Sequence, residues 1–373
     1  MSSTLTEPST EPAPESGPES GPEPELGPGF EPSAQSIEAR IARHPENFRI
    51  LTGDRPTGPL HLGHYLGTLA NRVRLQQAGV EVFLVIADYQ VITDRDTIGN
   101  LPQIVEELVL DYLAAGIDAE TATVFTHSAV PALNQLMLPF LSLVTDAELR
   151  RNPTVKAESA ATGNRPLSGL LLTYPVHQAA DILFCHGNLV PVGRDQLPHL
   201  EMTRTIARRF NERYAAGTAY FPEPEALLTA APVLLGTDGT KMSKSRGNAI
   251  ELRAGEDETA RLIRAAKTDS LRTITYAPDQ RPEVASLLLT AALCTGTDPV
   301  ELADSLGDRG SAALKALVTE AVNEHLRPLR RRRETLARDR GQLRDVLHRG
   351  NDRANEVAGT TLHEVRELMH MIY

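Results

Sequence analysis

The sequence of 373 residues predicts an α/β fold in which a doubly wound parallel sheet is followed by a helical region. Two observations support this fold class. Short, continuously apolar runs such as residues 81–87 alternate with longer segments of helical periodicity, which is typical of parallel strands buried on both faces. Strand signals then become rare from about residue 253 onward, where charged residues and helical patterns dominate.

The expected elements follow one another along the chain. Strands are predicted at residues 48–52, 81–87, 122–126 and 189–192. Helices are predicted at residues 66–78, 104–113, 131–144, from just after Tyr174-Pro175 to 184, and at 196–214, 285–293, 312–321 and 361–371. Ligands of such sheets bind beyond the carboxyl ends of the strands, so residues 52–53, 87–88 and 192–193 are expected to face a site.

Residues 1 to about 35 have the composition of a disordered tail. Pro, Glu, Ser and Gly dominate this segment, and the first basic residue of the chain is Arg40. Seven glutamates lie in it, at positions 7, 11, 15, 19, 23, 25 and 31, so most of the net charge of −11 belongs to the tail. The acidity of the chain therefore does not argue against nucleic-acid binding by the remainder.

The sequence lacks the features of a membrane protein or of a disulfide framework. No apolar run reaches about 18 residues, which predicts that no segment spans a membrane. The two cysteines, Cys185 and Cys294, form no zinc-binding spacing with histidine, and we expect no metal ion held by the protein itself. Low cysteine use favours a reducing, cytoplasmic compartment.

Residues 53–67, Gly-Asp-Arg-Pro-Thr-Gly-Pro-Leu-His-Leu-Gly-His-Tyr-Leu-Gly, connect the first predicted strand to the first predicted helix. Such a connection forms an anion site, because the first helical N–H groups lack internal partners and the helix dipole favours negative charge. His61 and His64 lie at the helix start, and Gly63 lies between them, where a side chain would keep a phosphate or a ribose at a distance. A second notable stretch, Lys-Met-Ser-Lys-Ser, occupies residues 241–245.

These two stretches resemble the HIGH and KMSKS signatures of the class I aminoacyl-tRNA synthetases. Residues 61–64 differ from the first signature only by Leu for Ile, and residues 241–245 match the second in every letter. The specific resemblance is to the tryptophanyl-tRNA synthetases and covers roughly residues 47–373. It also rests on residues 87–93, 169–175, 179–183, 190–196 with His199 and Glu201, and 267–270.

The resemblance implies a domain organisation and an activity. It implies a Rossmann-like catalytic domain at residues 36–252 and a helical anticodon-binding region at 253–373, whose last helix is expected to pack back on the catalytic domain. The implied reaction is ATP-dependent activation of L-tryptophan to tryptophanyl-adenylate, followed by transfer to tryptophan tRNA, with release of pyrophosphate and AMP. Substrate-bound Mg²⁺ and a homodimer are also implied. Because charge moves onto phosphate oxygens during activation, positioned cations and histidine donors would stabilise the transition state.

Roles for individual residues follow from the same resemblance. The implied catalytic residues are His61, His64, Lys241, Ser243 and Lys244. The implied ATP-binding residues are Gly53, Arg55, Gly63, Gly193, Asp195 and Met242. The implied amino-acid-binding residues are Leu51, Gln90, Tyr174, Gln178, Asp181, Val190, Val192 and Gln196. Asp181 would accept the indole N–H, which is only a donor, and Tyr174 and Gln196 would hold the α-ammonium group.

The amino-acid site departs from the common bacterial pattern. Leu51 replaces an aromatic residue, Gln90 replaces a frequent His, and Gln178 replaces a Met that packs on the indole. These differences suggest a divergent, auxiliary bacterial type. Tyr174, Gln178 and Asp181 together also match the archaeal-type tyrosyl-tRNA synthetases, so tyrosine is the alternative substrate. Residues 179–181, Ala-Ala-Asp, and residues 190–193, Val-Pro-Val-Gly, resemble the tryptophan enzymes and therefore favour tryptophan.

Further alternatives concern the helical region and the reaction. Arg330, Arg331 and Arg332 are predicted to bind tRNA phosphates, although a charged run can also be a solvated helix face. A small-molecule nucleotidyltransferase would share the first signature, but it would not explain the large helical region. A paralogue that binds tryptophan for another partner would conflict with the intact residues 241–245.

Overall fold

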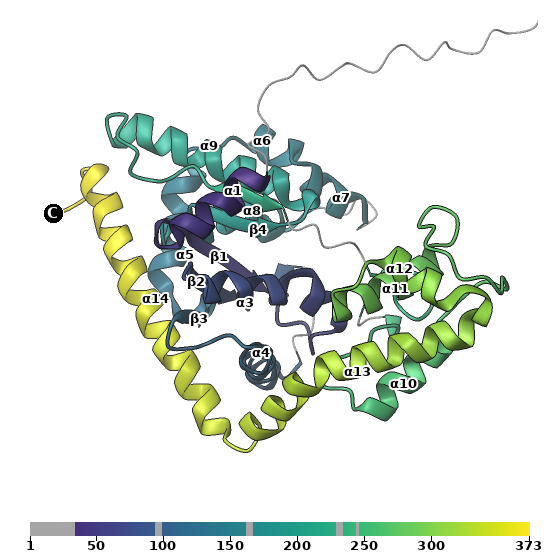
Figure 1. Cartoon of the computed structure of the whole chain (residues 1–373). Coiled ribbons are helices and arrows are strands. Elements are labelled where there is room, and N and C mark those ends of the chain that lie inside the picture. Colours follow the sequence, from purple (N-terminus) through teal and green to yellow (C-terminus); the bar gives the residue numbers. More distant parts are fainter. Residues whose placement is uncertain (1–33, 94–98, 162–166, 229–233, 244–245) are drawn as a thin grey trace, which may run out of the picture. The chain divides into compact units, whose positions relative to one another are not determined.

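A five-stranded parallel sheet forms the centre of the protein (Figure 1). The computed structural model describes residues 34–93, 99–161, 167–228, 234–243 and 246–373, apart from the side chains of residues 34–36, 93, 158–161 and 195. The strands are β1 (Arg49–Asp54), β2 (Glu81–Ile86), β3 (Ala122–Thr126), β4 (Leu189–Val192) and β5 (Glu225–Leu228). Their order is β3-β2-β1-β4-β5, which confirms the predicted doubly wound sheet.

The helices of the first two thirds of the chain alternate with these strands. They are α1 (Ala34–Arg43), α2 (Leu62–His64), α3 (Ala70–Gln77), α4 (Leu101–Ala115), α5 (Pro131–Leu141), α6 (Asp146–Arg151), α7 (Pro153–Ala161), α8 (Gly169–Leu183) and α9 (Leu197–Tyr214). Shorter turns are η1 (Pro45–Asn47), the π-helical η2 (Tyr65–Leu69), η3 (Tyr89–Thr93), η4 (His127–Ala129) and η5 (Arg194–Gln196). The predicted tail lies outside the described residues up to residue 33.

The last third is helical, as predicted. It contains α10 (Glu256–Ala265), α11 (Pro282–Thr295), α12 (Pro299–Leu306), η7 (Gly307–Arg309), α13 (Gly310–Leu336) and α14 (Arg340–Leu368). The helices predicted at residues 312–321 and 361–371 are only parts of α13 and α14, which have 27 and 29 residues. Many of their positions are charged, so an apolar stripe marked only part of each helix.

The sheet separates two apolar cores, and alternate residues of each strand face opposite sides. Val82 and Leu84 of β2 belong to the core that includes α3 and α4. Phe83 and Val85 belong to the core that includes α5, α8 and α9. Burial on both faces explains why the β2 sequence is continuously apolar, as the period-two geometry of a strand requires.

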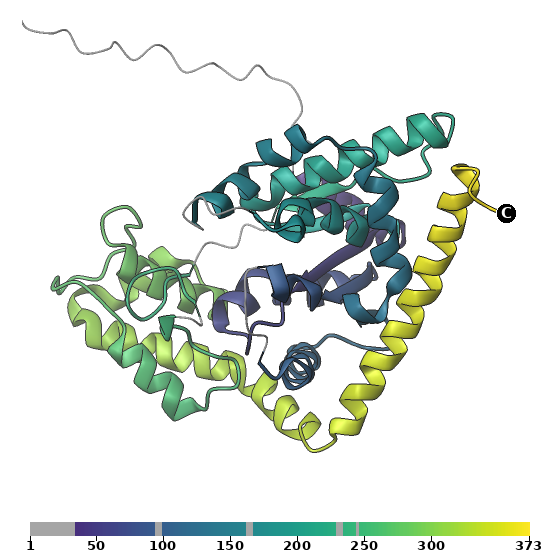
Figure 2. The same ribbon diagram turned by 180° about the vertical axis from the view of Figure 1, so that it is seen from behind.

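Helix α14 covers the free edge of β3 (Figure 1), and Figure 2 shows this helix from behind. A Cβ atom added at Gly350 would lie 1.9 Å from the Val124 carbonyl oxygen, so the helix approaches the strand closely at this glycine. Asn351 Oδ1 accepts a hydrogen bond from the Thr126 N–H, at 3.0 Å. The helix therefore shields a strand edge whose backbone groups would otherwise be open to pairing with another chain.

Helix α13 is bound to α4 by buried charge. Arg333 donates to Asp111 Oδ1 at 2.8 Å and also to Glu107. Asp111 Oδ2 accepts in turn from the Leu60 N–H, at 3.3 Å, so the loop after β1 shares this carboxylate. Residues 34–373 form one unit of continuous contacts, and a domain division near residue 252 stays a prediction.

Two of the helix starts that differ from prediction lie at a pocket. Helix α8 begins at Gly169 and not after Tyr174-Pro175, because the Ser168 hydroxyl caps the Leu171 N–H, at 3.1 Å, and starts the helix upstream of the proline. The helix expected from residue 66 begins at Leu62, so His64 lies inside it. No helix in the described part of the chain is long and apolar enough to cross a membrane.

Candidate functional site

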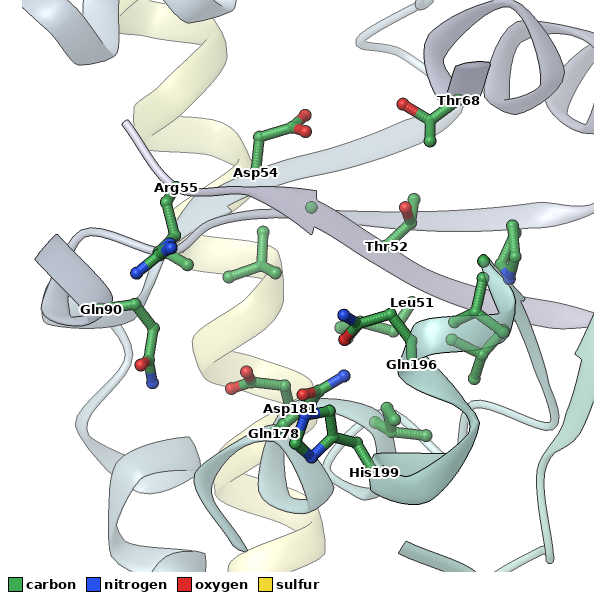
Figure 3. A pocket seen from close by; sticks show the side chains of 18 of the residues that line it. Leu51, Thr52, Asp54, Arg55, Thr68, Gln90, Gln178, Asp181, Gln196 and His199 are labelled. Carbon is green, nitrogen blue, oxygen red and sulfur yellow. The ribbon is translucent and has the colours of Figure 1, made fainter. Parts of the chain in front are cut away.

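A pocket of about 460 Å³ opens beyond the carboxyl ends of β1 and β4. These neighbouring strands form the switch point of the sheet, because the strand order reverses direction there. The predicted residues that line the pocket are Leu51, Gly53, Arg55, Gly63, His64, Gln90, Tyr174, Gln178, Asp181, Val190, Val192, Gly193 and Gln196. Figure 3 shows Asp54 and Thr68 at one end of the pocket and Gln178, Asp181 and His199 at the other.

At the first end, β1 approaches β2 so closely that only glycine fits at position 53. A Cβ atom there would lie 2.1 Å from the Val85 carbonyl oxygen and 2.4 Å from a Val85 side-chain carbon. The next residue, Asp54, pairs with Arg72 of α3 and accepts from the Tyr112 hydroxyl, at 2.7 Å. Burial opposes ionisation of this carboxyl, but Arg72 and Tyr112 lower the pKa of Asp54 to about 2.

The two predicted signature segments are in contact. His61 is the residue that precedes α2, and its ring centroid lies 3.7 Å from that of His64. The Leu62 N–H donates to the Ile250 carbonyl, at 2.8 Å, just beyond the second signature. A Cβ atom at Gly63 would lie 3.1 Å from the His61 ring and 3.5 Å from Met242 Sδ. Glycine at this position therefore leaves room for the ring of His61, while Met242 comes within ordinary contact distance.

The start of the second signature is held by Asn248, which is buried. Its Oδ1 accepts from the Ser243 N–H, at 2.8 Å, and its Nδ2 donates to the Asp238 carboxylate and to the Lys241 carbonyl. Lys241 is exposed. The predicted catalytic Lys244 lies outside the described residues, and so does the side chain of Asp195.

At the other end of the pocket, Asp181 of α8 forms a buried charge pair with His127. His127 Nε2 lies 2.9 Å from Asp181 Oδ1, and the His127 side chain is 0% exposed. Burial disfavours both charges. The attraction between the two groups outweighs it, so that the pKa of His127 is raised and the pKa of Asp181 is lowered.

A second histidine, His177, belongs to a chain of side-chain hydrogen bonds. The Asn134 amide nitrogen donates to the backbone carbonyls of His127 and Val130, at 2.6 and 2.9 Å, so its oxygen faces His177 Nε2, at 2.8 Å. Because an amide oxygen only accepts, His177 Nε2 carries the proton. His177 Nδ1 then accepts from the Gln90 amide, at 2.9 Å. Burial and the neighbouring His127 lower the pKa of His177, which favours this neutral form.

His127, His177 and Asp181 are also the one group among the described side chains with the composition and spacing of metal ligands. One candidate ligand atom from each lies within 4.8 Å of the others, and all three residues are buried. Two imidazoles and a carboxylate suit zinc and similar ions. Both ring nitrogens of His177 already have protein partners, however, so the hydrogen-bond chain explains the position of this ring without an ion.

Sequence reasoning missed His127, His177 and Asn134 as parts of the site, and it named His199 in a family signature without giving it a role. His199 Nε2 lies 3.0 Å from the Tyr174 hydroxyl at the pocket wall. The rule for strand ends could have identified His127, because it directly follows β3, in the same way that Asp88 follows β2. Periodicity could not have identified Asn134, because its role depends on contacts between α5 and α8.

The three predicted tRNA-binding arginines lie on α13, outside the residues that line this pocket. Arg330 donates to Asn323 and to the Thr259 hydroxyl, both at 2.8 Å. Arg332 donates to the Ala114 carbonyl, at 2.7 Å. Arg331 is exposed. Arg332 is exposed as well, and the binding of these arginines to RNA stays a prediction.

Known proteins resemble the chain over most of its length. The family described as class I tRNA synthetases (W and Y) matches residues 43–327. A tryptophan–tRNA ligase of Treponema pallidum (strain Nichols) is 42% identical over 328 residues, which cover 86% of this chain and 96% of that protein. A tryptophan–tRNA ligase of Clostridium longisporum is 40% identical and covers 87% of this chain and 97% of its own length.

Solved structures give the same result for the fold. The tryptophanyl-tRNA synthetase of Mycoplasma pneumoniae has a TM-score of 0.74 at 29% identity, covering 87% of this chain and 97% of that one. The enzyme of Campylobacter jejuni complexed with ADP and tryptophan has a TM-score of 0.73 at 28% identity, covering 87% and 100%. The chain therefore belongs to the class I aminoacyl-tRNA synthetases, in the family of the tryptophan and tyrosine enzymes.

Proposed function

We infer that this chain is a tryptophan–tRNA ligase. It activates L-tryptophan with ATP to give tryptophanyl-adenylate and pyrophosphate, and it transfers the tryptophanyl group to tRNA with release of AMP. The proposal is supported above all by one pocket at the switch point of the sheet, which combines the first signature segment with the buried carboxylate of Asp181. Relatives about 40% identical over nearly their whole length carry the same activity in their names.

The end of the pocket near α2 is the proposed ATP site. Gly53, Gly63 and His64 line this end of the pocket, which the first signature segment forms. His61 and His64 are the proposed donors to the phosphate oxygens. Lys241 and Lys244 are the proposed cations that stabilise the charge developing as pyrophosphate leaves. Mg²⁺ is proposed to enter with ATP and to be coordinated by its phosphates.

The opposite end is the proposed tryptophan site. Asp181 accepts the indole N–H, and Val190 and Val192 contact the ring, since all three line the pocket. Tyr174 and Gln196 hold the α-ammonium group in this proposal. A carboxylate suits the indole because the indole nitrogen only donates, and a charge-assisted hydrogen bond is about twice as strong as a neutral one.

Further partners belong to the same proposal. The exposed Arg331 is the proposed contact for tRNA phosphates, and a homodimer is the proposed assembly. A cytoplasmic location stays a prediction from the low cysteine content.

Two assays made side by side test the function. The first is tryptophan-dependent exchange of pyrophosphate into ATP, and the second is charging of transcribed tryptophan tRNA. We expect both activities, with tyrosine giving exchange at least about tenfold slower at equal concentration. Exchange with tyrosine at the rate of tryptophan would assign the enzyme to tyrosine. Exchange without charging would indicate a paralogue that does not serve translation.

An Asp181→Ala variant tests the site itself. Loss of an acceptor facing a buried donor costs about 1–3 kcal/mol, so tryptophan activation should fall about tenfold or more while the KM for ATP changes little. The matched control is Asp146→Ala, which removes an exposed carboxylate of α6 that pairs with Arg150. Equal loss in both variants would contradict the assignment of Asp181.

A further inference from the structure

The partner of Asp181 is a second feature of the amino-acid end of the pocket. His127 Nε2 lies 2.9 Å from Asp181 Oδ1, yet His127 is fully buried and is absent from the pocket lining. Asp181 thus lines the pocket, whereas its partner His127 lies behind it and does not. An isolated carboxylate in such a place would be strongly destabilised and would take up a proton.

His127 is held in place from three directions. Its backbone carbonyl accepts from the Asn134 amide, at 2.6 Å. The next residue, Ser128, donates its N–H to the carboxylate of Asp88, at 3.1 Å, and Asp88 in turn follows β2. Its ring lies 4.5 Å, between centroids, from the ring of His177. The position of the imidazole is therefore set by β2, α5 and α8 together, and not by the turn η4 alone.

The charged groups around His127 give it one counter-ion within contact distance. Asp181 is at 2.9 Å, and Asp88 is a further carboxylate whose attraction also favours the charged imidazole. His177 is neutral in the hydrogen-bond chain from Gln90 to Asn134, so it cannot supply the positive charge that Asp181 needs. Among the described side chains, His127 is the basic group that contacts this carboxylate.

We propose that His127 is a positioning residue for tryptophan recognition, which holds Asp181 by one carboxylate oxygen and directs the other oxygen toward the indole N–H. This inference rests on the proposed function, in which Asp181 contacts the indole ring. It adds that His127 orients Asp181. Fixing one oxygen limits rotation of the carboxylate. The carboxylate is then already oriented before tryptophan binds, so less conformational entropy is lost on binding.

The test compares tryptophan with an analogue that lacks only the donor, 3-benzothienylalanine, in which sulfur replaces the indole N–H. The protein contains no tryptophan, so binding of tryptophan can be followed by the fluorescence of the ligand, and the analogue can be measured by competition. Wild-type protein should prefer tryptophan by about tenfold or more, because only tryptophan satisfies Asp181. In His127→Leu this ratio should fall to within about threefold, while the analogue binds nearly as before.

A second variant separates positioning from packing. His127→Gln keeps a side-chain N–H that can reach the carboxylate, and it should retain most of the preference for tryptophan. Both variants should raise the KM for tryptophan more than they change the kcat of pyrophosphate exchange or the KM for ATP. His363→Leu is the control, because His363 is an exposed histidine of α14.

Each other outcome contradicts the proposal in a distinguishable way. If His127→Leu keeps the full tryptophan preference, His127 does not position Asp181. If both ligands weaken equally in both variants, His127 has only a packing role. If wild-type protein does not distinguish the ligands, the assignment of Asp181 fails, and the role of His127 fails with it. If a chelator removes the wild-type preference, the three side chains act as metal ligands instead.

Discussion

Arg72 Nη1 lies 2.5 Å from Asp54 Oδ2, and this pair joins the carboxyl end of β1 to α3 beneath the proposed ATP site. The side chains are 4% and 16% exposed, so water screens the pair poorly. Removing one partner of a buried pair leaves an uncompensated charge, which costs about 3–5 kcal/mol. Asp54→Asn should therefore lower the free energy of unfolding, measured in urea near neutral pH, by that order.

The pH dependence of this contribution has a defined direction. Interaction with Arg72 and Tyr112 lowers the pKa of Asp54 to about 2 in the folded protein, against about 3.9 when unfolded. The stabilisation is complete above pH of about 4 and is lost as pH falls toward about 2. The difference between wild type and Asp54→Asn should shrink over that range. As a control, Asp146→Asn breaks an exposed pair and should cost less than about 1 kcal/mol at any pH.

Gly350 and Gly359 provide a second comparison, because both lie on α14 and only one touches the sheet. A Cβ atom at Gly350 would lie 1.9 Å from the Val124 carbonyl oxygen, whereas one at Gly359 has no atom within 4 Å among the described residues. Gly350→Ala should lower the free energy of unfolding by about 2 kcal/mol or more, since backbone would have to move. Gly359→Ala should stabilise by up to about 1 kcal/mol through helix propensity. Equal effects would contradict the close contact of α14 with β3.

The comparison of sequence and structure shows which features local patterns predict. The strands at residues 122–126 and 189–192 were predicted to the residue, because apolar runs between turn residues specify buried parallel strands. Strand β5, Glu225–Leu228, was missed, since four residues without a β-branched side chain carry no strand signal. It becomes a strand by pairing with β4, which is a tertiary effect.

The same distinction holds within the site. Residues in signature segments, such as Gly53 and Asp181, were identified from the sequence and do line the pocket. The partner His127 was not identified, because it lies 54 positions from Asp181 and meets it only through the packing of η4 against α8. A short local motif cannot encode a contact between such distant segments, and strand ends are the better guide to them.

Asn248 is predicted to control the second signature segment. It joins Ser243, Lys241 and Asp238 through its amide, so loss of this side chain should free the loop that carries the lysines proposed to be catalytic. Asn248→Ala should reduce the rate constant of adenylate formation by about tenfold or more in single-turnover measurements, with a smaller effect on tryptophan affinity. Arg261→Ala, which removes an exposed arginine of α10 that pairs with Glu258, is the control. An unchanged rate would exclude Asn248 as the organiser of the loop.

Arg331 and Arg333 are predicted to differ although they lie two residues apart. Arg331 is exposed, and neutralising one phosphate contact should raise the KM for tRNA and lower the salt slope of binding by about one. Pyrophosphate exchange should be unaffected. Arg333 pairs with the buried Asp111, so Arg333→Ala should mainly destabilise the fold. If Arg331→Ala leaves the tRNA salt dependence unchanged, the RNA contact lies elsewhere.

Gln178 is predicted to set how strictly tryptophan is chosen over tyrosine. It lines the pocket beside Asp181, one helical turn earlier in α8 (Figure 3). Tyrosine offers a hydroxyl that can satisfy both Asp181 and a neighbouring amide, whereas an indole ring satisfies Asp181 through its N–H and offers only carbon atoms to the amide. Gln178→Met should therefore improve the ratio of kcat/KM for tryptophan over tyrosine about fivefold in pyrophosphate exchange, which corresponds to about 1 kcal/mol. Asp181→Ala is the reference, because it should weaken both amino acids. A ratio that stays constant or moves toward tyrosine in Gln178→Met would show that selection depends on the width of the pocket and not on the amide.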